Sequence, residues 1–332
     1  MTTIDDLTAA GLRRHDVDAH GTRIHVAEMG SDDAPLVLFV HGFPESWYSW
    51  RHQLPVVAAA GWRAAAIDVR GYGSSEAPEA IDAYRLVDLA GDCVGVVEAL
   101  GAETAVVVGH DWGSPIASTA ALLRPDVFTG MALLSVPYSP RSSPRPTEVF
   151  RMMGGEHTFY IDYFQEPGVA EAEIADNPDR WLRDMAWSAS GDAPPPDPDE
   201  SSGFVVVEGG RLDDRFQTPD EMPAWRTAEE QAFYVAEFAR AGFTGGLNRY
   251  RCVDHDWMDL RAFHGAPICQ PSLFIGGEKD GPTIWMGAAI AAFERTLPGL
   301  HASVVLPGVG HWIQQEAPEA TNDLLLDFLA AI

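Results

Sequence analysis

Short apolar runs alternate with amphipathic stretches through the first 138 residues of the chain. Runs with continuous or alternating apolar side chains are typical of buried or half-buried strands. Those runs are TRIHVAEMG (22–30), LVLFV (36–40), AAAID (64–68), TAVVVG (104–109) and MALLSV (131–136). Between them, LVDLAGDCVGVVEALG (86–101) repeats apolar side chains along one helical face and stops at a glycine. Strands that alternate with helices predict an α/β fold with a mostly parallel sheet flanked by helices.

The pattern changes after Pro137. Residues 139–262 contain no comparable series of strands and predict helices rich in aromatic side chains, interrupted by the Pro- and Asp-rich loop GDAPPPDPDESSG (191–203). Two strand patterns and a closing amphipathic helix follow, at PSLFIGG (271–277), ASVVLPG (302–308) and ATNDLLLDFLAAI (320–332). The simplest organisation is one α/β core domain, residues 1–138 and 263–332, with a helical insertion of residues 139–262, called the cap below.

The 332 residues carry a formal net charge of −27, and 46% of them are hydrophobic. This hydrophobic content suffices for a substantial core, and the negative charge argues against nucleic acid or anionic membranes as partners because phosphates would be repelled. Cys93, Cys252 and Cys269 are scattered and odd in number, which favours a reducing cytoplasm. The N-terminus lacks the apolar run of a signal peptide, and no stretch approaches the roughly 20 apolar residues of a membrane span. We therefore expect a soluble cytoplasmic protein.

The segment GHDWGSPIAS (109–118) follows an apolar strand and opens a helical pattern. In the nucleophile elbow G-x-S-x-G, small residues flank a serine on a sharp strand-to-helix turn. Here Asp111 stands in place of the serine, between Gly109 and Gly113. A carboxylate is already ionised at neutral pH, so it needs no base before it attacks. Asp111 is therefore the candidate nucleophile, and the alternative is that it only caps the helix that begins near Ser114.

Two further residues lie where an acid and a base are needed. A hydrolase site built on a nucleophile elbow requires both after the nucleophile in chain order. Asp280 directly follows one strand in LFIGGEKDG, and His311 directly follows the last strand in VVLPGVGHW. Both fall at the carboxyl ends of strands, where open α/β sheets bind their ligands. This order and placement indicate a catalytic triad of Asp111, Asp280 and His311.

The segment LVLFVHGFPESW (36–47) ends a strand in a tight turn. The turn would direct the backbone amide of Phe43 toward Asp111. Together with the amide of Trp112, it would form an oxyanion hole of two donors. Pro44 would also have a structural role in this turn, and the two roles are compatible.

HGFPESWYSWRHQLP, DVRGYGSS, GHDWG and VGHW together resemble the α/β-hydrolase-fold epoxide hydrolases, and the resemblance covers nearly the whole chain. It implies the α/β-hydrolase fold, with residues 139–262 as the cap domain. Two cap segments, FYIDYFQEPGVAEAE (159–173) and GFTGGLNRYR (242–251), resemble those that carry the family's two epoxide-binding tyrosines. Carried over residue by residue, these are Tyr160 and Tyr250. Tyr163, three positions after Tyr160 and able to share its helical face, is the alternative for the first.

The resemblance also implies a pocket for the substrate. Its expected lining residues are Phe43, Trp112, Tyr163, Phe164 and Trp312. Arg249 departs from the family's pattern, because relatives often have an aromatic residue before the second tyrosine. This arginine would change the polarity of the pocket and leave Tyr250 in place.

The activity implied by the resemblance is the conversion of an epoxide to a vicinal diol through an alkyl ester on Asp111. Tyr160 and Tyr250 would activate the epoxide oxygen, and His311, oriented by Asp280, would activate the water that hydrolyses the ester. The partners are then a small-molecule epoxide and water, and neither a metal nor an organic cofactor is required. A role in detoxification and the formation of a homodimer both stay open.

Haloalkane dehalogenases are the main alternative, because they share the core and the GHDWG elbow. Trp112 would then solvate the departing halide. Many of these enzymes have a polar residue at the position of Phe43, and none needs paired cap tyrosines, so the epoxide hydrolases fit better. A second alternative is a non-catalytic receptor for a small molecule, which the fold also supports but which would have no use for the triad.

Overall fold

The computed structural model of the protein describes residues 3–195 and 204–332. Its main sheet has eight strands in the spatial order β1-β2-β4-β3-β5-β6-β9-β10. The strands are β1 (Arg13–Ala19), β2 (Thr22–Met29), β3 (Leu36–Val40), β4 (Arg63–Ile67), β5 (Ala105–His110), β6 (Phe128–Leu134), β9 (Ser272–Gly277) and β10 (Leu300–Leu306). β2 pairs antiparallel with both β1 and β4, and the other neighbouring strands are parallel. The predicted mostly parallel α/β sheet is confirmed.

The edge strand β1 was not predicted from the sequence. Its residues, RRHDVDA, are mostly polar because the strand borders solvent, where most of its side chains are exposed or half-exposed. By contrast, β3, β4 and β5 lie inside the sheet and are buried at every position. Strands buried on both faces give the continuous apolar runs from which a parallel sheet is predicted.

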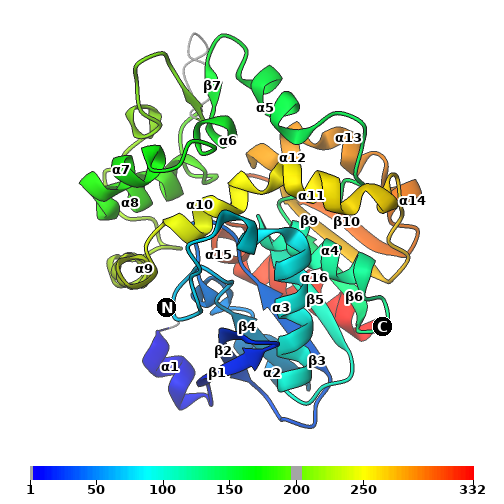
Figure 1. Cartoon of the computed structure of the whole chain (residues 1–332). Coiled ribbons are helices and arrows are strands. Elements are labelled where there is room, and N and C mark those ends of the chain that lie inside the picture. Colours follow the sequence, from blue (N-terminus) through cyan, green and yellow to red (C-terminus); the bar gives the residue numbers. More distant parts are fainter. Residues whose placement is uncertain (1–2, 196–203) are drawn as a thin grey trace.

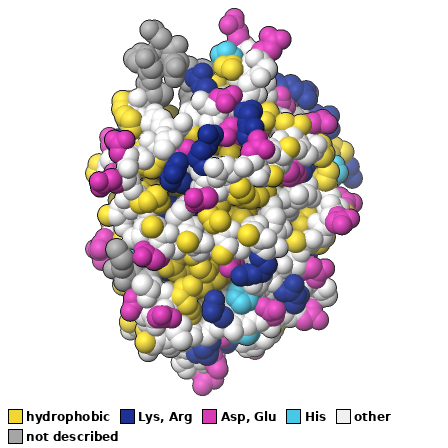
Figure 2. Space-filling view, turned by 90° about the vertical axis from the view of Figure 1, so that its left-hand side faces the viewer, with side chains coloured by type: hydrophobic (Ala, Val, Ile, Leu, Met, Phe, Trp, Pro, Cys, Tyr) yellow, Lys and Arg dark blue, Asp and Glu magenta, His cyan; other side chains and the backbone are white. Residues whose placement is uncertain are grey.

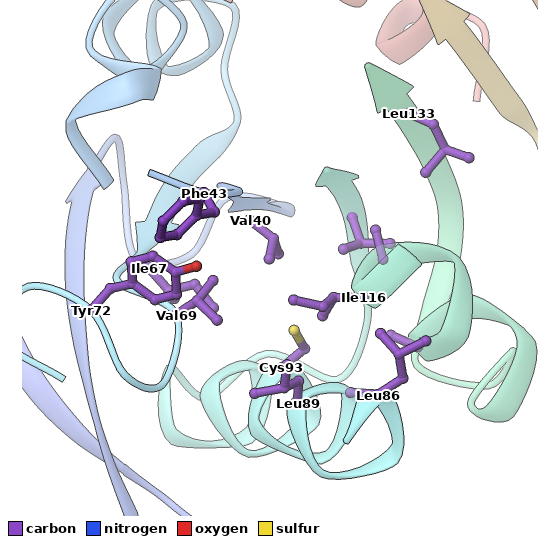
Figure 3. Packing of buried hydrophobic residues seen from close by; sticks show 14 of the residues in the cluster. Val40, Phe43, Ile67, Val69, Tyr72, Leu86, Leu89, Cys93, Ile116 and Leu133 are labelled. Atoms are coloured by element: carbon purple, nitrogen blue, oxygen red, sulfur yellow. The ribbon is translucent and has the colours of Figure 1, made fainter. Parts of the chain in front are cut away.

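Helices cover both faces of the sheet (Figure 1). The core helices are α1 (Ile4–Ala9), η1 (Trp47–Trp50), α2 (Leu54–Ala59), η2 (Ile81–Tyr84), α3 (Leu86–Ala99), α4 (Gly113–Leu123), α12 (Gly281–Trp285), α13 (Gly287–Ile290), α14 (Phe293–Thr296), α15 (Ile313–Glu316) and α16 (Pro318–Ala330). On one face, Cys93 of α3 and Ile116 of α4 pack in the same cluster as Val40 of β3 (Figure 3). On the other face, Phe39 of β3 packs with Phe328 of α16. Alternate residues of β3 thus enter two separate apolar layers, as the period of a strand requires.

Residues 139–262 fold mainly into helices, which lie beyond one edge of the sheet in the upper part of Figure 1. These are α5 (Pro146–Gly154), α6 (Tyr160–Tyr163), α7 (Val169–Asp176), α8 (Pro178–Ser188), η3 (Asp213–Arg215), α9 (Ala228–Ala241), α10 (Thr244–Arg251), α11 (Val253–Asp259) and η4 (Leu260–Phe263). A short antiparallel pair, β7 (Thr158–Phe159) with β8 (Val205–Val206), was not predicted, because two residues are too few to give a pattern. Of the predicted loop at 191–203, residues 196–203 lie outside the described residues. The boundaries of the cap stay a prediction.

The negative charge of the chain is spread out rather than concentrated on the face that Figure 2 shows. Asp and Glu side chains are scattered over this face, with Lys and Arg side chains among them. Within residues 3–195 and 204–332, no helix has both the length and the apolar character needed to cross a membrane.

Candidate active site

Asp111 lies on a sharp turn between β5 and α4. Its backbone φ is +51°, in the left-handed region that non-glycine residues seldom adopt. A Cβ atom at Gly109 would collide with the carbonyl of Gly113, and one at Gly113 would collide with the carbonyl of Val40. The two flanking glycines are therefore required by close backbone approach, as a nucleophile elbow needs.

Two backbone amides hold the carboxylate of Asp111. The amide of Phe43 donates to its Oδ1 over 2.8 Å, and the amide of Trp112 also bonds the carboxylate. Gly42 approaches so closely that a Cβ there would collide with Oδ1. The structure therefore brings together the two amides predicted for the oxyanion hole, and it leaves Oδ2 as the oxygen that faces His311.

The imidazole of His311 lies between two carboxylates. Its Nε2 is 3.6 Å from Oδ2 of Asp111, and its Nδ1 is 2.8 Å from Oδ1 of Asp280. The other oxygen of Asp280 accepts hydrogen bonds from the hydroxyls of Ser135 (2.8 Å) and Thr283 (2.7 Å). The three predicted triad residues thus meet at the carboxyl ends of β5, β9 and β10. Ser135 and Thr283 were missed, although Ser135 stands directly after β6 at the same sheet edge.

Burial and charge together set the protonation of the triad. Burial raises the pKa of Asp111. Burial would lower the pKa of His311, but the charges of Asp280 and Asp111 outweigh it and raise this pKa to about 9. Burial opposes ionisation of Asp280 as well, yet His311 and the hydrogen bonds lower its pKa. At neutral pH the imidazole of His311 is therefore protonated and paired with Asp280.

A third buried carboxylate, Glu45, supports the backbone on either side of the site. Its Oε2 lies 2.7 Å from Nδ1 of His110, and Nε2 of His110 lies 2.8 Å from the carbonyl oxygen of His311. Its Oε1 accepts from the side-chain amides of Gln314 (3.1 Å) and Gln315 (2.9 Å). Burial would raise the pKa of Glu45, but His110 and the hydrogen bonds hold it at about 2. This network was missed from the sequence, because no spacing links its members.

The two cap tyrosines lie together against the elbow. Tyr250, on α10, is buried, and its ring centroid lies 5.0 Å from that of Trp112 and 6.1 Å from that of Tyr160, the first residue of α6. Burial and the charge of Asp111 raise the pKa of both phenols well above its ordinary value, so both stay protonated at neutral pH. The hydroxyl of Tyr163 instead donates to Glu173 over 2.8 Å. The structure therefore places Tyr160, not Tyr163, beside Tyr250.

Aromatic rings surround the nucleophile. Phe43 contacts Tyr250 and Phe164 edge to face, with centroids 5.5 and 6.1 Å apart. Trp312 is fully buried against His311, with centroids 4.7 Å apart. Further rings around Phe43 were not predicted, and they are Tyr72, Trp181 and Phe238. Apart from the triad and the tyrosine hydroxyls, these side chains give the site an apolar lining.

Arg249, the residue that departs from the family's pattern, is buried beside Trp112. Its guanidinium lies 4.9 Å from the centroid of the indole and donates to the carboxylate of Asp256 and to the carbonyl of Tyr84. Burial lowers its pKa to about 10, so it stays charged at neutral pH. The ion pair with Asp256 offsets this charge, and the stacked guanidinium supports Trp112.

Comparison with known proteins places the chain in a family. The sequence profile of the α/β-hydrolase fold family matches residues 35–194. Epoxide hydrolase A of Mycobacterium tuberculosis is 44% identical over 95% of this chain and 97% of its own, and epoxide hydrolase B of the same organism is 42% identical over 95% and 98%. The structure of an epoxide hydrolase from an endophytic Streptomyces superposes with a TM-score of 0.94 at 56% identity, over 97% of this chain and 96% of that one. Epoxide hydrolase A from Mycobacterium thermoresistibile gives 0.90 at 44% identity, over 96% and 98%.

Proposed function

The chain belongs to the epoxide hydrolases of the α/β-hydrolase fold, and we propose that it converts epoxides to vicinal diols in two chemical steps, with Asp111 as nucleophile. The observation that carries this proposal is the position of Tyr250 against Trp112 of the elbow, with Tyr160 beside it and the charge of Asp111 acting on both phenols. Two phenols close to a carboxylate supply the proton donors that opening of an epoxide needs.

In the first step, Oδ2 of Asp111 attacks a ring carbon, and the carbon–oxygen bond of the epoxide breaks. The released oxygen takes a proton from a tyrosine hydroxyl, so that no free alkoxide forms. Because Oδ1 is held by the amide of Phe43 and Oδ2 faces His311, Oδ2 is the oxygen available for attack. The product of this step is an alkyl ester on Asp111.

In the second step, His311 takes a proton from a water molecule, which attacks the carboxyl carbon of Asp111. The amides of Phe43 and Trp112 stabilise the resulting oxyanion. The ester bond then breaks, the departing oxygen takes a proton from His311 to complete the diol, and the Asp111 carboxyl returns its proton to His311. Esterification removes the negative charge of Asp111, which is one of the causes of the raised pKa of His311. The first step therefore lowers this pKa, and the proton of the imidazolium passes to the tyrosinate that ring opening leaves behind. His311 is then neutral and can act as a base.

A covalent intermediate gives the direct test. A His311→Gln variant, incubated with a panel of aryl, cyclic and linear epoxides, should accumulate protein heavier by one whole epoxide, with the added mass on Asp111 in peptide mapping. The double variant Asp111→Asn, His311→Gln is the control and should gain no mass. A parallel panel of chloroalkanes and bromoalkanes tests the dehalogenase alternative.

The outcomes separate the candidate functions. An adduct from epoxides supports the proposal. An adduct formed only from haloalkanes, lighter than the whole haloalkane by the lost hydrogen halide, would replace it with dehalogenation. No adduct from either panel, together with no turnover by the unmodified protein, would contradict both and leave a binding role.

A further inference from the structure

A short cap segment, residues 186–191, makes hydrogen bonds to the loops that carry two triad residues. The carbonyl of Ala189 accepts the backbone amide of His311 over 2.9 Å. The carbonyl of Ala186 accepts the indole N–H of Trp312 over 2.7 Å. The carbonyl of Gly191 accepts the ammonium of Lys279, the residue before Asp280. The cap segment thus bonds to the backbone of His311 and to the neighbours of both triad residues, Trp312 beside His311 and Lys279 beside Asp280.

Glu316, in α15, joins the same segment from the core side. Its Oε2 accepts the amides of Gly191 (2.8 Å) and Gly310 (2.9 Å), and its Oε1 accepts the amide of Trp312 (2.9 Å). One carboxylate therefore ties a cap residue to the residues on both sides of His311. Hydrogen bonds from backbone amides to a carboxylate are charge-assisted and stronger than neutral ones.

The cap segment and the loop of His311 meet backbone to backbone at Gly191 and Gly310. A Cβ atom at Gly191 would collide with the carbonyl of Gly308, and one at Gly310 would collide with the amide of Gly191. Only glycines allow this approach, so the contact is a built feature of the cap–core boundary rather than a loose surface contact.

We propose that Glu316 and cap residues 186–191 form a clamp that sets the position of His311, with Glu316 as a positioning residue for the second chemical step. This inference rests on the proposed function, in which Tyr160 and Tyr250 of the cap act in the first step and His311 of the core acts in the second. Both steps take place on the carboxylate of Asp111. The clamp fixes the cap to the core domain at the loop that carries His311. A single arrangement of cap and core therefore positions the reacting groups for both steps.

The clamp is tested from both sides of the boundary. Glu316→Gln places an amide N–H₂ against backbone donors, and Gly191→Ala pushes the cap segment away from Gly308 and Gly310. The matched control is Glu319→Gln, the same change of charge at an exposed glutamate three residues further on. For each variant, rapid-quench intact mass measures formation and decay of the ester on Asp111, with the epoxide that gives the largest adduct on His311→Gln.

The clamp predicts a selective effect on the second step. Decay of the ester should slow by about 10–100-fold in Glu316→Gln and Gly191→Ala, because a misplaced catalytic group costs rates of this order, while ester formation changes by less than about threefold. The pH profile of ester decay should shift in these two variants and stay unchanged in Glu319→Gln.

Equal slowing of both steps, or decay rates like those of the control, would overturn the clamp. If Glu316→Gln does not fold, two other variants test the clamp. Gly191→Ala alters the cap segment, and Lys279→Met removes the hydrogen bond from the residue before Asp280 to the carbonyl of Gly191. Failure of the proposed function looks different, because the His311→Gln variant would then form no ester at all.

Discussion

The core half of the site orients its reacting groups with hydrogen bonds, whereas the cap half orients its tyrosines mainly by packing their rings. Asp280 is bonded by His311, Ser135 and Thr283. Tyr250, in contrast, is surrounded by rings, with the centroids of Trp112 and Phe164 each 5.0 Å away. Its hydroxyl oxygen accepts a hydrogen bond from the indole of Trp112, which leaves its proton free to be donated.

The difference fits the roles that we propose for the two halves. A base that must meet a water molecule depends on the direction of its ring and on its tautomer, and both are set by hydrogen bonds. A phenol that must donate to the substrate needs a hydroxyl that can turn toward a new acceptor, and ring packing leaves that freedom. Tyr163 shows the opposite case, because its hydroxyl is already committed to Glu173.

The largest effect on rate should come from disrupting the hydrogen bond between Asp280 and His311 in the core half of the site. Asp280→Asn removes the negative charge and replaces one of the two accepting oxygens with an N–H₂ donor, which disturbs the orientation and tautomer of His311. We therefore expect ester hydrolysis to slow on the order of 10³–10⁴-fold. Ester formation should change by less than about tenfold, because His311 takes no proton in that step. Single-turnover mass measurements would show the ester persisting. Hydrolysis within tenfold of the unmodified protein would mean that Asp280 does not orient the base.

Substitution of the cap tyrosines should have a smaller effect, and it should slow ester formation rather than ester hydrolysis. Tyr250→Phe and Tyr160→Phe should each slow ester formation by about 10–100-fold, and the double variant by about 10²–10⁴-fold, since each removes a proton donor and keeps the packing of the ring. Tyr163→Phe is the matched control and should leave ester formation within about twofold. If Tyr163→Phe slows this step and Tyr160→Phe does not, the assignment of the first tyrosine reverses.

The same contrast explains how much could be predicted from the sequence. The core half follows from motifs at strand ends, because a parallel sheet brings its carboxyl ends to one edge. For that reason Asp111, Asp280 and His311 could be expected at one edge of the sheet, and the structure brings their side chains together there. Glu45 was missed, since its partners lie in segments far apart in the chain.

The cap half could be predicted only in outline. The spacing of Tyr160 and Tyr163 allows both to face the site, and what separates them is a hydrogen bond to Glu173 that depends on how α6 and α7 pack. The contact of Gly191 with the loop of His311 is tertiary as well. Contacts of this kind depend on how distant segments pack in the folded chain, so no local sequence pattern predicts them.

The smallest effect is a pH dependence that belongs to the core half alone. The pKa of His311 is raised from its ordinary value near 6.5 to about 9 by the charges of Asp280 and Asp111, in spite of burial. The ion pairs therefore stabilise the fold fully below about pH 6.5, where the folded and unfolded chains both hold the proton. Between pH 6.5 and 9 only the folded chain holds it, so the stabilisation is lost as pH rises, on the order of 1–3 kcal/mol in all.

Thermal unfolding of the unmodified protein and two variants between pH 5.5 and 9.5 measures this contribution. The advantage of the unmodified protein over His311→Gln should shrink as pH rises through this window. Tyr160→Phe should keep the pH dependence of the unmodified protein, because burial and the charge of Asp111 keep the pKa of Tyr160 well above this range. A constant gap between the unmodified protein and His311→Gln would mean that the imidazole is neutral in the resting site. The first step could then not lower its pKa into the working range, and the two halves of the site would act independently.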